Sequence, residues 1–143
     1  MLRSGQQVVT RSLRIARIIG QDEAPSASDS SVAREVLSTM LDNWRFDTEF
    51  VPENCDDFSV PNFPDLITQV DADPALLAAI YYNLAVLLAP EFGSQVEALV
   101  ERTARAYRRT WTRKVASLSV GRMEMELGYL PFHRSGYDIV TDT

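Results

Sequence analysis

Residues that commonly carry catalysis or bind metals are scarce in this chain. Among 143 residues there is one cysteine, Cys55, and one histidine, His133. A lone cysteine excludes a disulfide framework within the chain and a cysteine-based metal site. His133 has no serine or cysteine at a recognisable nucleophile spacing, and the sequence has no glycine-rich phosphate loop, HExxH motif or aspartate-rich calcium loop. We therefore expect no catalytic residue, no metal and no cofactor.

Long hydrophobic runs are also missing. The longest weakly charged run, residues 74–90, is interrupted by Asn83 and two tyrosines and is shorter than the ~20 residues that span a bilayer. The N-terminal stretch MLRSGQQVVTRSLRIARIIG has arginines between its apolar residues, so it lacks the charged-then-apolar order of a secretory signal. These features favour one domain that is made in the cytoplasm and has no membrane contact.

Positive charge is absent from the middle of the chain. Residues 46–101 contain eleven Asp or Glu and no Lys or Arg, whereas residues 102–134 contain eight Lys or Arg and two acids. The net charge of −6 therefore conceals an acidic middle and a basic end. Such asymmetry is typical of a chain that contacts a polyanion, or whose basic end meets an acidic face on a neighbouring copy. Two solvated faces of one monomer would give the same pattern.

Two amphipathic helices are predicted in the first third of the chain. The segment QQVVTRSLRIARIIG, residues 6–20, repeats apolar residues at helical spacing, carries arginines on the opposite side and has Gly20 as a C-terminal stop. Ser26 or Ser28 is a suitable N-cap for the next helix. That helix is predicted over 28–45, because apolar residues recur along one face.

A long irregular segment and a third helix follow. Residues 46–72 contain prolines, acids and aromatics without a helical period, which indicates a loop with at most short strands. Asp73 is a suitable N-cap for the third helix, Pro74 fits its first turn, and Pro90 is expected to end it. Because apolar residues cover most of its circumference, we expect this helix at the centre of a bundle.

The last part of the chain is predicted to be a fourth helix and then an extended segment. Ser94 and Glu97 have the spacing of a capping box, and the short turn before them makes the third and fourth helices antiparallel neighbours. From residue 116 onward, apolar residues alternate and glycines and a proline recur, which is typical of extended chain. An unpaired extended segment is suited to binding another chain.

The predicted architecture is therefore all-α: a small antiparallel bundle of about four helices with a long acidic loop and an extended C-terminal arm. The body covers residues 1–115, including the irregular loop 46–72, and the arm covers residues 116–143. Tyr82 is expected nearer a helix or subunit interface. The predicted bundle core comprises Val36, Met40, Trp44, Leu77, Ile80, Tyr81, Leu84, Leu88, Val100 and Tyr107.

Basic residues interleaved with aromatics run along the fourth helix. They are Arg102, Arg105, Arg108, Arg109, Arg113 and Lys114. Such a pattern occurs in nucleic-acid-binding helices, on solvated faces and on interfaces with acidic neighbours. The rigid proline turn before this helix does not suit a helix-turn-helix reader. We interpret these cations as a subunit interface or a polyanion contact.

The order of the helical segments resembles a known family. A short helix closed by glycine is followed by APSASDSSVAREVLSTMLDNW, an acidic proline-containing loop, YYNLAVLLAPEFG and ERTARAYRRTW. This order is similar to that of the head-to-tail adaptor proteins of tailed bacteriophages, and most of all to the tail accessory factors (head completion proteins) of short-tailed phages. The similarity spans about residues 10–115 and is carried mainly by Leu41, Asp42 and Trp44 and by the segment from Asn83 to Gly93.

The resemblance implies a helical bundle that assembles as a homo-oligomeric ring, usually twelve-fold, beneath the portal protein after DNA packaging. Such a ring in the virion neck extends the DNA channel, helps to retain the genome and is the platform for the next tail or nozzle protein. An acidic segment suits a channel wall near packaged DNA, because like charges repel the phosphates.

In this family a C-terminal arm typically holds the portal. Residues 116–143 do not match the family's pattern, but an unpaired extended segment is suited to the same contact, which we expect to use Leu118, Val120, Met123, Met125, Leu127, Tyr129, Leu130 and Phe132. One alternative is a small peptidoglycan hydrolase, an activity suggested for some phage tail accessory proteins, which needs a carboxyl with a raised pKa opposite a second carboxylate. A DNA-binding helical module is the other alternative, and its affinity would depend steeply on salt.

Overall fold

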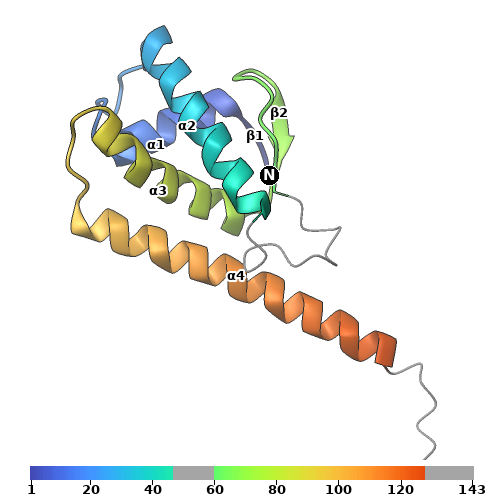
Figure 1. Cartoon of the computed structure of the whole chain (residues 1–143). Helices are drawn as coiled ribbons and strands as arrows, with labels where there is room; N and C mark the ends of the chain where they lie inside the picture. Colours follow the sequence, from blue (N-terminus) through green and yellow to red (C-terminus); the bar gives the residue numbers. More distant parts are fainter. Residues whose placement is uncertain (47–59, 128–143) are drawn as a thin grey trace, which may run out of the picture.

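The computed structural model describes residues 1–46 and 60–127, with side chains up to Ser117 (Figure 1). Its elements are β1 (Leu2–Ser4), α1 (Gly5–Ile15), α2 (Ala27–Phe46), β2 (Gln69–Asp71), α3 (Pro74–Glu91) and α4 (Ala98–Leu127). The two short strands form an antiparallel pair in which Arg3 is opposite Val70. The fold is mostly helical, which confirms the predicted all-α bundle, and β2 is a short strand of the kind allowed for residues 46–72.

Helix α3 is the centre of the bundle, because it packs against both α1 and α4. Its start is as predicted: Asp73 accepts a hydrogen bond from the Ala75 N–H at 2.8 Å, and Pro74 is the first helical residue. Within the described residues, α3 is the one helix long and apolar enough to cross a membrane, with a mean hydropathy of 1.3. Half of it is buried inside the fold, as in a core helix.

Helices α3 and α4 are antiparallel neighbours, joined by the short segment 92–97 (Figure 1). Asn83, the one amide in the apolar centre of α3, links them: its Nδ2 donates to the Ala79 carbonyl at 2.8 Å and to the Ala104 carbonyl of α4 at 3.1 Å. Ala85 and Ala89 are fully buried, and Val100 of α4 packs against them. Small residues and one amide therefore let the two helices approach closely.

The described part of the predicted irregular segment, residues 60–68, is fastened to α2. Two arginines of α2 donate to proline carbonyls: Arg34 to Pro64 at 2.5 Å and Arg45 to Pro61 at 3.2 Å. This arrangement leads the chain across α2 and into β2. The rest of the predicted loop, residues 47–59, lies outside the described residues.

The end of α1 differs from the prediction, because the helix stops before Gly20. Arg17 adopts a left-handed backbone with a φ of 56°. Its N–H donates to the Arg14 carbonyl at 3.1 Å, and the Ile18 N–H donates to the Leu13 carbonyl at 3.0 Å. These two bonds define a Schellman motif, in which glycine normally occupies the left-handed position. Here Arg17 occupies that position, so the glycine further on was the wrong stop signal.

The end of α3 uses the same motif with the usual residue. The helix runs through Pro90 to Glu91, one residue past the predicted end, because a proline in the last turn removes only one helical hydrogen bond. Gly93 has a φ of 65°, its N–H donates to the Pro90 carbonyl at 3.1 Å, and the Ser94 N–H donates to the Ala89 carbonyl at 2.8 Å. Ser94 therefore belongs to the end of α3.

The predicted capping box of α4 is wrong for that reason. The helix begins at Ala98, and the Glu97 carbonyl accepts from the Glu101 N–H at 3.2 Å. The Glu97 carboxylate does not bond back to Ser94. It forms an ion pair with Arg17 at 2.6 Å, which joins the start of α4 to the turn after α1.

The predicted extended segment from residue 116 is also wrong as far as Leu127, because α4 continues to that residue without a break. The alternation of Leu118, Val120, Met123, Met125 and Leu127 resembles a strand, but methionine, glutamate and leucine are strong helix formers, and the MEMEL run continues a helix already under way. In Figure 1 this part of α4 projects beyond the other helices. Residues 128–143, including Tyr129, Leu130 and Phe132, lie outside the described residues.

Most residues predicted for the core are buried: Met40, Trp44, Leu77, Ile80, Tyr81, Leu84 and Leu88. Val36 and Val100 are partly buried and pack against the core clusters. The assignment of Tyr107 is wrong, because its side chain is 37% exposed. Helix α4 instead turns Trp111 and Val115 into the core, at 2% and 1% exposure, and Tyr107 lies at the edge of that face.

Candidate functional site

The six cations predicted as an interface on α4 divide into two groups. Three of them have partners within the chain. The Lys114 ammonium lies 2.5 Å from the Asp73 carboxylate at the start of α3. The Arg108 guanidinium lies 5.7 Å from the ring centroid of Trp44, and Arg105 pairs with Glu101 at 3.5 Å. Lys114 and Arg108 attach α4 to the body, and Arg105 stabilises the first turns of α4. These three cations therefore already have partners within the chain.

The other three, Arg102, Arg109 and Arg113, form what we name the basic stripe. All three are exposed and have no hydrogen bond or ion pair with the described part of the chain. Spacings of seven and four residues put them on one side of the helix. Because Trp111 and Val115 face the core, this side points away from the body. A protein with a net charge of −6 therefore presents, in a row, three guanidinium groups that have no partner among the described residues.

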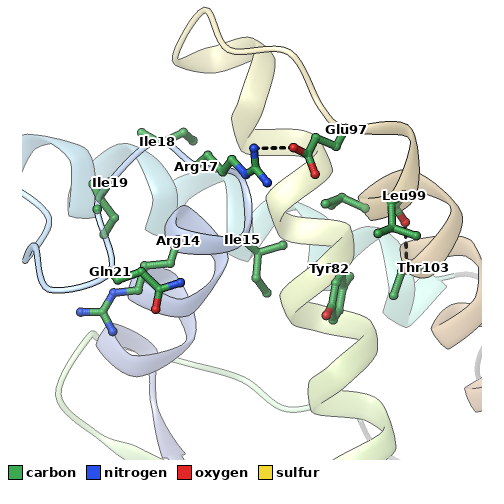
Figure 2. A pocket seen from close by; sticks show the side chains of 12 residues that line it. Arg14, Ile15, Arg17, Ile18, Ile19, Gln21, Tyr82, Glu97, Leu99 and Thr103 are labelled. Atoms are coloured by element: carbon green, nitrogen blue, oxygen red, sulfur yellow. Dashed lines mark hydrogen bonds and ion pairs between the residues drawn. The ribbon is translucent and has the colours of Figure 1, made fainter.

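A groove of about 580 Å³ lies between the turn after α1, the middle of α3 and the first turns of α4 (Figure 2). We name it the α1–α4 groove. Figure 2 shows Arg17 and Ile18 on one side of the groove and Leu99 and Thr103 on the other. Leu99 is 67% exposed, which is unusual for a leucine on a packed helix, whereas Ile18 is partly buried. The groove thus combines apolar walls with a charged rim, to which Arg14 also contributes.

Tyr82 of α3 lies in this groove, consistent with its expected place near a helix interface. Its ring packs against Tyr107 of α4, with centroids 5.2 Å apart and planes tilted by 31°. Tilted aromatic pairs of this kind are favourable contacts. The pair joins the wall of the groove to the partly exposed edge of α4.

Arg17 is held at the rim in a backbone conformation that does not suit it. The left-handed region costs a non-glycine residue about 1–2 kcal/mol. The ion pair with Glu97 offsets only part of this cost. The two side chains are 75% and 45% exposed, and exposed ion pairs stabilise a protein by up to about 1 kcal/mol. Strain of this kind occurs preferentially at functional positions.

Replacing Arg17 with glycine is expected to leave the free energy of unfolding unchanged or to raise it by up to about 1 kcal/mol. Glycine adopts the left-handed backbone without strain, and this gain offsets the lost ion pair. Urea unfolding followed by circular dichroism measures the change. Arg14→Gly is the matched control, since it places glycine inside α1 and should destabilise by about 1 kcal/mol. A loss of more than 2 kcal/mol in Arg17→Gly would contradict the proposed strain.

Among the described residues, two carboxyl groups have shifted pKa values, and both shifts are downward. The pKa of Asp65 is lowered mainly by the backbone N–H of Thr68, with further hydrogen bonds from the Thr68 hydroxyl and the Ile67 N–H. The pKa of Asp73 is lowered mainly by the hydrogen bond from Lys114. A general acid needs a raised pKa, so neither group has the property that the hydrolase alternative requires. The described residues also contain no group of three or more His, Cys, Asp or Glu placed to hold a metal ion.

The Asp73–Lys114 pair makes a pH prediction. Folding lowers the pKa of Asp73 below its usual 3.8. The charged carboxylate therefore adds to the free energy of unfolding above pH 3.8, and this stabilisation is lost as the pH falls through the lower pKa of the folded state. Asp73→Asn keeps an N-cap side chain but removes the charge, so it should destabilise by about 0.5–1 kcal/mol at pH 7. The difference in the free energy of unfolding between the unmodified chain and Asp73→Asn should disappear when unfolding is measured in acid. An equal difference at pH 2 and pH 7 would rule out this charge effect.

No protein-family model and no curated protein matches the chain.

Sequence reasoning identified the basic stripe and missed the α1–α4 groove. The arginines of the basic stripe were among the predicted interface residues, although the sequence did not separate them from Arg105, Arg108 and Lys114. The groove was not predicted, because its walls come from three elements that only the turn at Arg17 brings together. The one available signal was the apolar pair Ile18 and Ile19, which continue the hydrophobic pattern of α1 beyond its end.

Proposed function

We propose that the chain is a structural connector of the head-to-tail junction of a tailed phage. It forms a homo-oligomeric ring, twelve-fold on the portal, that extends the DNA channel and helps to retain packaged DNA. It also provides the attachment platform for the next tail protein. In this proposal the protein is made in the host cytoplasm and resides in the neck of the virion.

The observation that supports this proposal most is the length of α4. Its core contacts extend to Val115, and its backbone continues to Leu127, beyond the other helices (Figure 1). A helix that projects into water adds little to the stability of the body, because helices in proteins are stabilised mainly by packing. A portal protein that packs against the projecting part of α4 would stabilise it. The portal would then bind α4 as a helix in a groove, and not as an extended strand added to the edge of a sheet.

The basic stripe supports the ring part of the proposal. Arg102, Arg109 and Arg113 have no acidic partner in the described part of the chain, and residues 46–101 contain no Lys or Arg. A heterologous ring places one face of each copy against a different face of the next. The stripe of one copy against an acidic surface of its neighbour would satisfy both charges and orient the two copies.

Light scattering of the purified chain with the portal protein from the same genome tests the proposal. The full chain should enter a large complex with the portal, whereas a chain ending at Ser117 should not. Circular dichroism and thermal unfolding of the shorter chain are the control, because Val115 and the body remain in it. If neither chain binds the portal, the connector function is excluded. Equal binding by both would exclude the projecting part of α4 and the residues after it as the portal contact.

The alternatives have distinct outcomes in parallel assays. A peptidoglycan hydrolase would solubilise purified cell wall, and a DNA-binding module would bind duplex DNA with an affinity that falls steeply with salt. The connector proposal expects no release of cell-wall fragments. It also expects only weak DNA affinity without sequence preference, since the protein as a whole is acidic.

A further inference from the structure

We propose that the α1–α4 groove binds residues 137–143 of a neighbouring copy, so that each subunit holds the C-terminal segment of the next. This inference deepens the proposed function and rests on it, because it names the contact that joins copies within the ring. It uses residues beyond those expected to hold the portal, the last of which is Phe132.

The groove has the chemistry of a peptide-binding site. Leu99, exposed at 67%, and Ile18 lie on opposite sides of the groove, so an apolar side chain bound beside Leu99 would cover exposed apolar surface. Arg14 and Arg17 add positive charge at the rim. The one acid in the lining is Glu97, which is already paired with Arg17. Its occupant is therefore expected to be apolar on one side and acidic on the other.

The segment YDIVTDT, residues 137–143, has this division when it is extended. Side chains alternate along an extended chain. Tyr137 and Ile139 then lie on one side, followed by Thr141 and Thr143, and Asp138 and Asp142 lie on the other with Val140 between them. The first side fits the apolar walls and the second fits the arginine rim. No other part of the chain outside the described residues combines these features without a proline, since the segment 47–59 contains Pro52.

The geometry of α4 favours a neighbouring copy over the chain's own segment. Leu99 and Leu127 lie on the same helix, about 42 Å apart at its usual rise per residue. Residues 128–139 span at most about 43 Å when fully extended. The chain's own Ile139 could reach its groove only by running straight back along α4 with no slack. A neighbour in a head-to-tail ring has no such restriction.

The strained turn gives an independent reason to assign a function to this site. Glycine would complete the Schellman motif without strain, as Gly93 does at the end of α3. Arg17 instead places a guanidinium at the rim of the groove, where it pairs with Glu97 and remains 75% exposed. A ligand that carries Asp138 and Asp142 accounts for the presence of arginine at this position.

Disulfide cross-linking between two pools of the full chain tests the proposal. Both pools carry Cys55→Ser, which removes the single native cysteine. One pool carries Leu99→Cys and an affinity tag, and the other carries Ile139→Cys. The pools are mixed with and without portal protein and treated with copper phenanthroline, so any cross-link between pools joins two copies. The control replaces Leu99→Cys with Ser38→Cys, an exposed position on α2 outside the groove.

The expected yield of cross-linked pairs is at least 10-fold above the Ser38→Cys control. Arg17→Gly in the first pool should lower it by 5-fold or more. A yield equal to the control would overturn the proposal. Sedimentation of the same samples reports portal binding: a portal complex without cross-links rejects the groove contact alone, and the absence of any portal complex rejects the connector function.

Discussion

Replacing Trp111 with alanine is expected to lower the free energy of unfolding by about 3–5 kcal/mol. Trp111 is the largest of the fully buried side chains and is 2% exposed. It belongs to the same core cluster as Val115 of α4 and Trp44 of α2. Its removal leaves a cavity between α4 and the rest of the bundle, so the loss should include both the transfer of the indole and the cavity.

Guanidinium unfolding of the variant gives the size of this effect. Tyr107→Ala is the matched control, because Tyr107 is on the same helix and is 37% exposed. It should destabilise by only about 1 kcal/mol, the contribution of an aromatic contact such as the one with Tyr82. If the two variants lose equal stability, Trp111 is not the residue that anchors α4.

Neutralising the basic stripe is expected to reduce assembly on the portal by at least 10-fold while leaving the fold intact. The variant carries Arg102→Gln, Arg109→Gln and Arg113→Gln. Surface substitutions of this kind change stability by less than about 0.5 kcal/mol each, and these side chains have no partner in the described part of the chain. The loss would therefore come from the contact between copies. Light scattering with the portal measures assembly, and thermal unfolding checks the fold.

A control with the same change in net charge separates the stripe from general electrostatics. Ser31→Glu, Ser38→Glu and Asn43→Glu add three negative charges to exposed positions of α2, as the glutamine variant removes three positive ones. Assembly should be unchanged in this control. If both variants lose assembly equally, net charge and not the stripe controls it. If DNA binding falls while assembly is unchanged, the stripe is a polyanion contact.

Sequence patterns predicted the helices well where one face is apolar and the other polar. The central place of α3 followed from its apolar circumference, and its start followed from Asp73 and Pro74. Local chemistry at these positions agrees with the tertiary structure, which is the condition under which sequence reasoning works. The predicted register of α4 was wrong at Tyr107, because Tyr107 and Trp111 are both aromatic and packing against the body decides which of them is buried.

The failures occur where a residue acts against its usual preference. Gly20 was a better stop signal than Arg17 by propensity, yet Arg17 takes the left-handed position. The strand β1 is three residues long and exists only because β2 lies beside it. The arm alternates like a strand, but its Met-Glu-Leu composition extends a helix that has already formed. The groove could not be predicted, since it depends on the first of these deviations.

Electron microscopy of portal protein mixed with the full chain tests the central claim most directly. A connector should add a ring of density to one end of the portal, with one copy of the chain for each portal subunit and twelve on a twelve-fold portal. The projecting part of α4 should lie against the portal wall. Portal particles that remain unchanged at saturating concentrations of a correctly folded chain would contradict the account.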